Sequence, residues 1–253
     1  MAAPDCPSIA QVFAVVIPAY GEAATIGEIV AGCRGAADIG AVIVVDDGSR
    51  DATAARAAAA GARVVGNPVN LGKGASLARG LALAMAGKVA GVITLDGDGQ
   101  HRPADLVRLI ARARARPGTI VIGSRRAASG APLSRYAANR VADFLISWAA
   151  GRAVDDSQSG FRLYPASVLR RLQLGAGLAG GFSFESEILI AAAWLGIGTE
   201  SVEIPAIYGP TLRRSHFRPL ADIGRIGATI GLRLLRRGFY PAGLWRALRR
   251  SRR

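Results

Sequence analysis

Residues 12–49 read VFAVVIPAYGEAATIGEIVAGCRGAADIGAVIVVDDGS, and the order of patterns in this stretch decides the fold class. Val12–Ile17 and Ala41–Val45 are short runs rich in Val and Ile that stop at Pro or Asp, which is typical of buried strands. Between them, Glu22–Cys33 is long enough for a helix, and Thr25 can cap its start. A strand, a helix and a second strand in this order predict two parallel strands of one sheet.

The same alternation continues through the first half of the chain. Further strands are expected at Arg63–Val65, Gly91–Leu95 and Thr119–Ile122, and further helices at Asp51–Ala60, Lys73–Ala86 and Pro103–Ala115. The second half is more helical, with one strand expected around Val202–Ala206 and helices at Leu133–Ala150, Ala166–Leu172, Phe184–Trp194 and Pro219–Arg237. The predicted fold class is α/β, a Rossmann-like, mostly parallel sheet flanked by helices. Its ligands should bind beyond the carboxyl ends of the strands.

Charge is distributed unevenly along the 253 residues. The formal net charge is +14 and the apolar content is 51%, which together exclude a disordered chain. From Pro210 onward there are twelve arginines and a single acid, Asp222, so +11 of the charge lies in the last 44 residues. The sequence therefore predicts a nearly neutral globular body followed by a basic C-terminal extension.

Several other classes of protein are excluded by composition. Two cysteines and two histidines are too few for a disulfide framework or a Cys/His zinc cluster. Residues 1–7 lack the basic and apolar regions of a secretory signal, and the longest uncharged candidate for a membrane span, Ile188–Thr199, is too short. A cytoplasmic protein without a transmembrane helix is expected.

Acidic residues follow three of the predicted strands. Asp96 and Asp98 lie two residues apart in a Gly-flanked loop with Gln100 close behind, and such hard oxygen donors can share Mg²⁺ or Mn²⁺ with a diphosphate. An Asp-Gly pair alone is more often a plain turn. Asp46-Asp47 after the second strand would suit a dinucleotide ribose, but PAYGE replaces the G-x-G-x-x-G loop that such binding needs. Lys73 is followed by Gly, so no ATP-binding P-loop is present either.

Six ordered segments resemble the motifs of family 2 glycosyltransferases, namely IPAYGEAATI, VVDDGSRDAT, NPVNLGKGASLARG, LDGDGQHRPADL, GSR and DSQSGFRLYP. The resemblance extends from about Val12 to Phe217. It is closest to the subgroup typified by dolichyl-phosphate mannosyltransferases and bacterial polyprenyl-phosphate sugar transferases. It implies a GT-A fold, a nucleotide-diphosphate sugar as donor, and inversion at the anomeric carbon.

The resemblance also implies a donor site and a metal site. It assigns Asp96, Asp98 and Gln100 to a Mg²⁺ or Mn²⁺ ion that compensates the charge of the leaving diphosphate. It assigns the donor nucleotide and diphosphate to Pro18, Ala19, Tyr20, Glu22, Asp46, Asp47, Lys73, Asp96, Arg213 and Arg214. For Lys73, a solvated side chain at a helix start is the simpler alternative.

On the acceptor side the resemblance assigns phosphate binding to arginines, whose guanidinium groups match phosphate oxygens well. The acceptor residues implied are Arg125, Arg135, Asn139, Ser159 and Arg162. Each arginine has the plain alternative of a solvated charge. Glu185 occupies the place of the family's general base and is, with Asp98 and Arg125, a candidate catalytic residue. A lipid phosphate is already an anion at neutral pH, so Glu185 can instead serve to position the acceptor.

The basic extension departs from the relatives that end in transmembrane helices. Ile223, Ile226, Ile230, Leu234 and Leu235 fall mostly three or four residues apart among arginines. Two interpretations remain open, a basic amphipathic helix on an anionic membrane surface and a helix packed on the body with a solvated face. The expected division is a catalytic domain over residues 1–217 and a basic amphipathic extension over residues 218–253.

The leading function is an inverting, metal-dependent transfer of a hexose from a GDP-mannose or UDP-glucose type donor to a polyprenyl or dolichyl phosphate. The expected location is the cytoplasm, at the inner face of the cell membrane. One rival keeps the family and changes the acceptor to a saccharide or another hydroxyl, which would make Glu185 an essential base. A nucleotidyltransferase lacks support from DSQSGFR, and a nucleic-acid-binding protein lacks a specific reading motif, since aromatics are only 6%.

Overall fold

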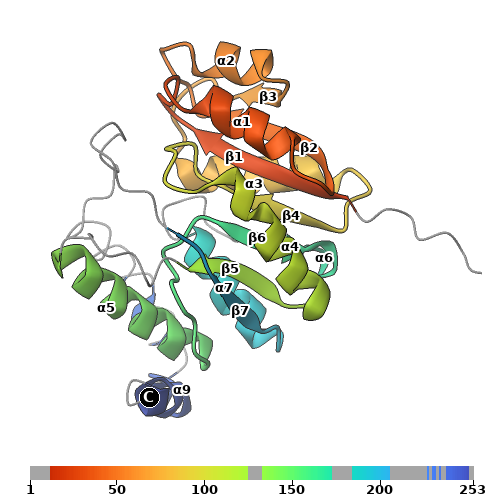
Figure 1. Cartoon of the computed structure of the whole chain (residues 1–253). Coiled ribbons are helices and arrows are strands. Elements are labelled where there is room, and N and C mark those ends of the chain that lie inside the picture. Colours follow the sequence, from red (N-terminus) through yellow and green to blue (C-terminus); the bar gives the residue numbers. More distant parts are fainter. Residues whose placement is uncertain are drawn as a thin grey trace, which may run out of the picture.

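The computed structural model is built on a seven-stranded mixed sheet (Figure 1). It describes residues 12–124, 133–172, 184–205, 227, 230–231, 234 and 238–250. The strand order is β3-β2-β1-β4-β6-β5-β7, and β6 alone runs antiparallel to its two neighbours. The strands are β1 (Phe13–Ala19), β2 (Ile39–Asp46), β3 (Arg63–Gly66), β4 (Gly91–Thr94), β5 (Ile120–Ser124), β6 (Arg162–Pro165) and β7 (Thr199–Glu203).

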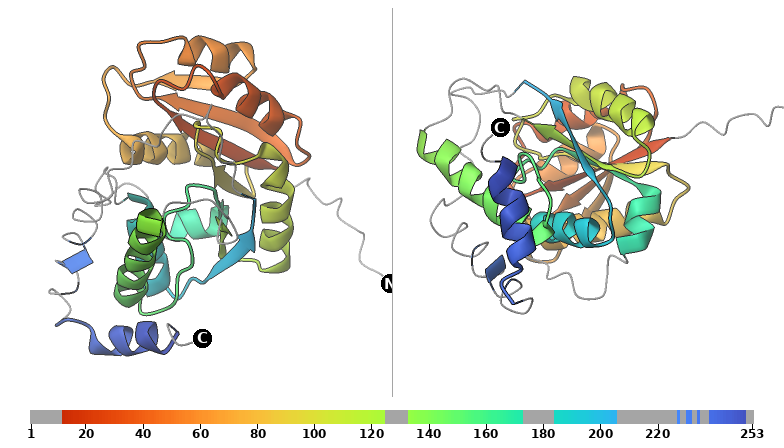
Figure 2. Two further views of the ribbon diagram at one scale, coloured as in Figure 1. Left: turned by 60° about the vertical axis from the view of Figure 1, so that its left-hand side comes forward. Right: turned by 90° about the horizontal axis from the view of Figure 1, so that it is seen from below.

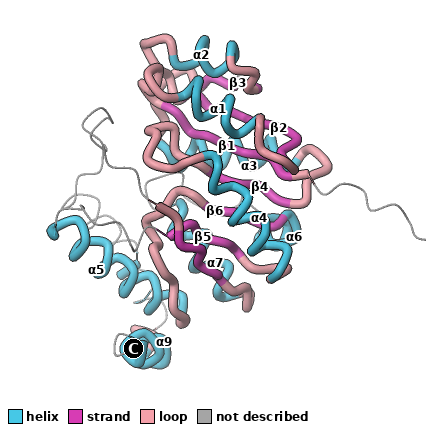
Figure 3. The backbone as a smooth tube through the Cα atoms, viewed as in Figure 1, coloured by secondary structure: helices cyan, strands magenta, loops and turns pink. Residues whose placement is uncertain are grey.

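The helices alternate with the strands as expected in the first half of the chain (Figure 3). They are α1 (Ile26–Arg34), α2 (Thr53–Ala59), α3 (Lys73–Met85), the 3-10 turn η1 (Pro103–Asp105) with α4 (Leu106–Ala115), α5 (Leu133–Ala150), α6 (Ala166–Leu172), α7 (Phe184–Trp194) and α9 (Pro241–Arg250). The α/β class with a mostly parallel sheet is thus confirmed.

Two details of the predicted strands were wrong. β6 was not expected, because RLYP carries an arginine and a proline and lacks a Val/Ile run. β7 begins at Thr199, three residues before the expected start at Val202, because its register follows β5, with Ile120 opposite Thr199. Thr25 also does not cap α1 with its side chain, since its hydroxyl donates to the Gly97 carbonyl at 2.5 Å.

Two layers of helices cover the sheet and make a core on each face (Figure 2). Successive residues of β1 point to opposite faces, so Val15 and Ile17 pack under α1, α2 and α4, whereas Ala14 and Val16 pack under α3, α6 and α7. All seven residues of β1 are buried. Burial on both faces explains why the central strands read as continuous apolar runs.

Helix α3 lies unusually close to the sheet at Gly80. A side-chain Cβ at this position would lie 3.1 Å from Cγ2 of Val45 and would overlap the side chain of Val16. The close approach of backbone to strand needs glycine here. Helix α3 starts at Lys73 and packs on β1 and β2.

The C-terminal extension packs at least partly on the body. Residues 227, 230, 231 and 234 are helical, and Ile230 and Leu234 are buried in the core that α3, α5, α6 and α7 share. These two members of the expected membrane-facing stripe therefore face the protein. No helix in the described ranges is long and apolar enough to cross a membrane.

Candidate active site

The loops that follow β1, β2 and β4 meet at the carboxyl edge of the sheet, as the sequence predicted. Parallel pairing sets Ala19 beside Asp46 at this edge, and Thr94 of β4 beside Val16. Gly97 lies so close to Glu22 that a Cβ there would be 3.3 Å from Cγ of Glu22. The first and fourth motifs therefore form one surface, with Tyr20 exposed over 40% of its area beside it.

The two acids of the DDGS motif are buried and bound by neighbouring loops. Asp47 accepts hydrogen bonds from the Leu71 amide (3.0 Å), the Gly72 amide (2.8 Å) and Nδ2 of Asn67 (2.7 Å). Asp46 accepts bonds from the amide (3.2 Å) and hydroxyl of Ser49. The Asp47 carboxylate therefore holds the loop that leads into Lys73, a structural role that the motif alone did not reveal.

Lys73 lies between two carboxylates from distant parts of the chain. Its Nζ is 2.8 Å from Oδ1 of Asp96 and 3.0 Å from Oε2 of Glu185, and its side chain is 29% exposed. Burial opposes the charge, but Asp96 and Glu185 outweigh that cost and raise the pKa of Lys73 above the ordinary lysine value. Lys73 is therefore a charged link between β4 and α7, and not a freely solvated side chain.

Glu185 stands at the first turn of α7 with its two oxygens in different settings. Oε2 is engaged by Lys73, whereas Oε1 is buried and accepts no hydrogen bond from any residue that the structure describes. A buried carboxylate oxygen without a donor is costly to leave in that state. Oε1 is therefore suited to accept a proton, or a hydrogen bond from a hydroxyl group, of a bound ligand.

Asp98 and Gln100 follow Asp96 in the loop after β4. The backbone N–H of Gln100 donates to Oδ1 of Asp98 at 3.0 Å, which orders the short loop. Among the residues that the structure describes, no group of three or more His, Cys, Asp or Glu side chains forms a metal cage. Two carboxylates and an amide still fit Mg²⁺ or Mn²⁺, because these ions take several of their oxygens from water and substrate phosphate.

The DSQSGFR loop reaches the same place from the other half of the sheet. The Gly160 carbonyl accepts a hydrogen bond from the Thr94 hydroxyl at 2.8 Å. A Cβ on Gly160 would lie 2.7 Å from Oδ1 of Asp96, so any larger residue would force that carboxylate to move. The segment assigned to the acceptor therefore touches the segment assigned to the donor and metal.

Two predicted acceptor residues in this loop are buried among protein groups. Arg162 is 0% exposed, and its guanidinium donates to the carbonyls of Ser157 (2.6 Å), Ser159 (2.7 Å) and Glu185 (2.8 Å). The Ser159 hydroxyl donates to the Gly123 carbonyl at 2.7 Å. Their observed contacts hold the loop and the start of α7 in place, and a direct contact with the acceptor stays a prediction.

The other predicted residues divide into those that are described and those that are not. Asn139 is half-buried on α5, and the backbone of Arg135 belongs to the same helix. Arg125, Arg213 and Arg214 lie outside the described residues. Asn67 was not singled out as a site residue, because its contact with Asp47 joins residues 20 positions apart, which a single sequence does not display. Gly160 belongs to the DSQSGFR segment that the resemblance places beside the acceptor, but its close approach to Asp96 is visible only in the structure.

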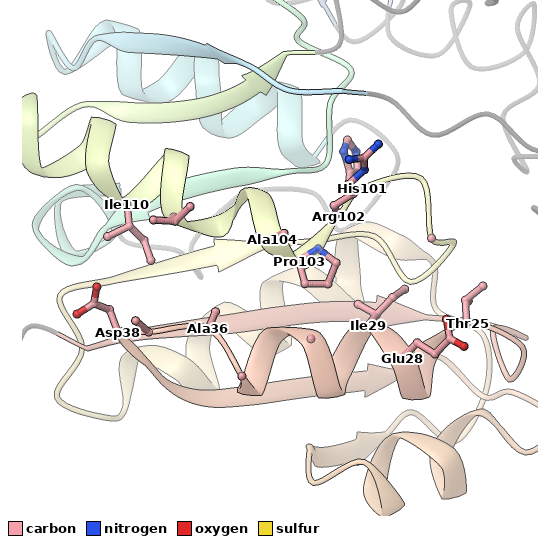
Figure 4. Close-up of a pocket in the computed structure, with 15 residues that line it drawn as sticks. Thr25, Glu28, Ile29, Ala36, Asp38, His101, Arg102, Pro103, Ala104 and Ile110 are labelled. Atoms are coloured by element: carbon pink, nitrogen blue, oxygen red, sulfur yellow. The ribbon is translucent and has the colours of Figure 1, made fainter.

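A separate groove of about 720 Å³ runs between α1 and α4 (Figure 4). Its wall is largely apolar and is made by residues such as Ile29, Pro103 and Ile110, with His101 and Thr25 at the end nearest the strand edge. None of the predicted site residues lines it. The candidate active site is therefore the cluster around Lys73, Asp96 and Glu185 and not this groove.

Comparisons with known proteins agree with this geometry. The profile of "Glycosyl transferase family 2" matches residues 14–173. An undecaprenyl-phosphate mannosyltransferase of Micrococcus luteus is 28% identical over 206 residues, covering 76% of this chain and 82% of its own. A polyprenol monophosphomannose synthase of Mycolicibacterium smegmatis is also 28% identical over 206 residues, covering 77% and 76%.

Solved structures show the same fold. A glucosyl-3-phosphoglycerate synthase of Mycobacterium tuberculosis in complex with Mg²⁺ and UDP aligns with a TM-score of 0.66 and 27% identity, covering 90% of this chain and 79% of its own. The family profile spans more than half of the chain, and the motif loops meet at one edge of the sheet. This protein is therefore a glycosyltransferase of the GT-A fold and belongs to glycosyl transferase family 2.

Proposed function

We propose that the protein transfers a hexose from a nucleotide-diphosphate sugar to a polyprenyl or dolichyl phosphate, with inversion and with a bound Mg²⁺ or Mn²⁺. The observation that carries the proposal is the contact of Gly160 with Asp96, because it brings the acceptor segment against the diphosphate end of the donor site. The names of the two lipid-phosphate relatives support the class of acceptor. A donor of the GDP-mannose or UDP-glucose type fits the same relatives and the UDP-bound neighbour.

The donor would lie along the carboxyl edge of β1, β2 and β4. Pro18, Ala19, Tyr20 and Glu22 would line the base and ribose, with Asp46 and Asp47 holding the surrounding loops by the hydrogen bonds described above. Lys73 would meet the ribose or diphosphate from the start of α3. Arg213 and Arg214 are proposed to contact the diphosphate.

Asp98 and Gln100, with Asp96, would hold the metal ion. The ion would supply positive charge against the diphosphate as the bond to the sugar breaks. The protein's contribution is to place two carboxylates at the end of a buried strand, where their orientation is set by the backbone. Solved structures of the neighbouring glucosyl-3-phosphoglycerate synthase contain Mg²⁺ or Mn²⁺ with UDP.

In the reaction, an oxygen of the acceptor phosphate forms a bond to the anomeric carbon as the bond from that carbon to the donor diphosphate breaks. The electron pair leaves with the diphosphate, and the attack from the opposite face inverts the centre. Arg125, Arg135 and Asn139 are proposed to bind the acceptor phosphate. Because that phosphate is already an anion, no proton has to be removed, and Glu185 with Lys73 would serve to position it.

A specific observation favours a second function. Oε1 of Glu185 is buried without a hydrogen-bond donor among the described residues, which suits a base that accepts the proton of a hydroxyl. A saccharide or other hydroxyl acceptor would use it in this way. Glu185→Gln separates the two proposals, because it should nearly abolish transfer to a hydroxyl and leave most of the transfer to a lipid phosphate.

The test is direct incubation of the full chain with radiolabelled GDP-mannose or UDP-glucose, polyprenyl phosphate and Mg²⁺ or Mn²⁺. Radioactivity should enter the organic phase on extraction, and omission of the lipid or chelation of the metal should prevent this. Label that enters only a water-soluble saccharide would favour the second function. No product with any nucleotide sugar or acceptor would contradict both.

We also propose the division into a catalytic domain, residues 1–217, and a basic extension, residues 218–253. The extension would hold the protein peripherally at the cytoplasmic face of the membrane, where a lipid phosphate is found. Eleven net positive charges after Pro210 support this location, since anionic lipids attract arginine at about 1 kcal/mol per residue. The burial of Ile230 and Leu234 means that the contact needs a different apolar surface from the one first expected.

A further inference from the structure

Helix α9 has an inner face and an outer face with different roles. Gly243 and Ala247 are buried on the inner face, where α9 packs against α5 (Figure 2). On the outer side Trp245 is 54% exposed and Leu248 is 49% exposed, and Phe239 in the preceding turn is 60% exposed. These three side chains are called the outer α9 surface below, and the exposed Arg246 lies at its border, with Nη1 3.5 Å from the Gly151 carbonyl.

The turn before α9 is held in an unusual backbone conformation. Phe239 and Tyr240 have φ values of 60° and 39°, a left-handed region that large aromatic residues seldom adopt. Nε1 of Trp148 donates to the carbonyls of both, at 3.1 and 3.2 Å. Tyr240 packs where Gly151 and Gly243 leave room for its ring. The body thus maintains a costly turn whose result is an exposed phenylalanine six residues before an exposed tryptophan.

The charge of the segment that carries this surface has one sign. Residues 238–253 contain five arginines and no acid. A second copy of the chain would place arginines against arginines without acids from this segment to pair them, and a nucleic acid would not use Leu248. An interfacial membrane contact uses all of these groups, because apolar side chains enter the acyl boundary, Trp lies at the headgroups, and Arg pairs with lipid phosphates.

We propose that the outer α9 surface docks on an anionic lipid bilayer. Because α9 packs on the end of α5, docking would also orient the helix whose beginning carries the proposed acceptor residues Arg135 and Asn139. Trp148 and Asn139 are nine residues apart, about 14 Å along the helix. The inference gives a surface to the membrane location proposed above, and its test does not depend on sugar transfer.

The test is co-sedimentation of the full chain with phosphatidylcholine vesicles that contain or lack phosphatidylglycerol. Wild-type protein should pellet with the anionic vesicles and much less with the neutral ones. The double substitution Phe239→Ser with Trp245→Ser should lower the partition coefficient by roughly tenfold or more, as expected for losing two buried aromatic groups. Arg246→Glu should lower it by roughly thirtyfold at low salt, from two units of charge.

Matched controls use residues of the same kind elsewhere. Val107 on α4 is 65% exposed, so Val107→Ser removes an exposed apolar side chain far from α9. Arg63 on β3 is exposed, so Arg63→Glu makes the same change in net charge. Both controls should bind vesicles like wild type, and circular dichroism should show that all variants fold.

The outcomes separate this inference from the proposed function. Equal loss of vesicle binding in Arg63→Glu and Arg246→Glu would mean that the net charge of the protein drives binding. This result would overturn the assigned surface. A wild-type protein that ignores anionic vesicles, or a dimer that Trp245→Ser dissociates, would overturn it as well. Selective loss in the α9 variants would support it even if no sugar transfer were ever detected.

Discussion

Asp96 and Asp98 in the N-terminal half of the sheet and Arg162 in the C-terminal half differ in how their charge is used. The N-terminal half, β3-β2-β1-β4, is all parallel, and its acids gather at the carboxyl edge, where Asp96 and Asp98 remain accessible enough to meet a ligand. The C-terminal half, β6-β5-β7, contains the antiparallel β6 and buries Arg162 completely, with its donors turned to backbone carbonyls. Asp96 and Asp98 of the first half are open to a ligand, whereas Arg162 of the second half, like the buried Asp47 of the first, holds a loop in place.

We expect that removing the buried charge of Arg162 mainly lowers the stability of the fold. Arg162→Met should lower the free energy of unfolding by about 3–5 kcal/mol, because three carbonyls lose a charged donor in a buried place. Urea unfolding followed by circular dichroism measures this. Arg171→Met on α6, whose guanidinium is exposed and bonds one carbonyl, is the control and should change little. A stable Arg162→Met protein that fails only in acceptor binding would reverse the assignment and restore direct contact.

Removing the accessible carboxylate of Asp98 should instead reduce activity and leave stability nearly unchanged. Asp98→Ala should leave the unfolding free energy within about 1 kcal/mol of wild type but reduce transfer by about 10²- to 10³-fold or more. Transfer to lipid phosphate and nucleoside-diphosphate release both measure it. Asp38→Asn, at the other end of the strands and already at φ 68°, is the control. Wild-type turnover in Asp98→Ala would contradict the metal assignment.

The contact between Gly160 and Asp96, where the two halves of the sheet meet, can be tested by adding one methyl group at Gly160. Gly160→Ala would push a Cβ into the Asp96 carboxylate, and a displacement of this size should cost roughly 10²-fold in transfer. Gly66→Ala on the edge strand β3 meets nothing within 4 Å and serves as the control. Normal turnover in Gly160→Ala would mean that the two loops separate when the donor binds.

A smaller effect is expected from the lysine that joins the halves. Lys73→Met and Glu185→Gln should show a coupling energy of about 1–2 kcal/mol in unfolding, since each removes one side of a partly buried ion pair. Lys88, the other lysine in the chain, is exposed, and Lys88→Met should be additive with Glu185→Gln. Additivity of Lys73→Met with Glu185→Gln would show that the link contributes nothing to holding α7 against β4.

An effect of similar size tests whether the Cys33 thiol on α1 is kept away from water in the N-terminal half. Burial raises the pKa of the Cys33 thiol to about 12 from 9.0. Above pH 9 the unfolded chain loses this proton and the folded chain keeps it, so stability falls as pH rises toward 12. Between about pH 8 and about pH 10.5, wild type should lose about 2 kcal/mol more unfolding free energy than Cys33→Ala. Parallel urea curves for the two proteins at both pH values would refute a buried thiol.

Much of the N-terminal half could be predicted from the sequence because its signals are local. Each strand there is a Val/Ile run, the acids of the candidate site follow such runs, and parallel strands bring their ends together without further information. β6 was missed because its burial comes from β4 and β5 on either side, and not from its own composition. The roles of Asp47 and Lys73 depend on partners 20 to 112 residues away, which no local pattern shows.

The placement of β6 also has a consequence for how the chain is made. Thr94 at the end of β4 pairs with Arg162, 68 residues later. At ribosomal rates of roughly 5–20 residues per second, roughly 3 to 14 s pass between the synthesis of β4 and that of its partner strand β6. During that time the strand that precedes Asp96 and Asp98 is an open, apolar edge, which is a site for pairing with the wrong chain. Mutations that slow the arrival or docking of residues 157–165 should therefore reduce yield in the cell through aggregation, before any loss of activity in the protein that does fold.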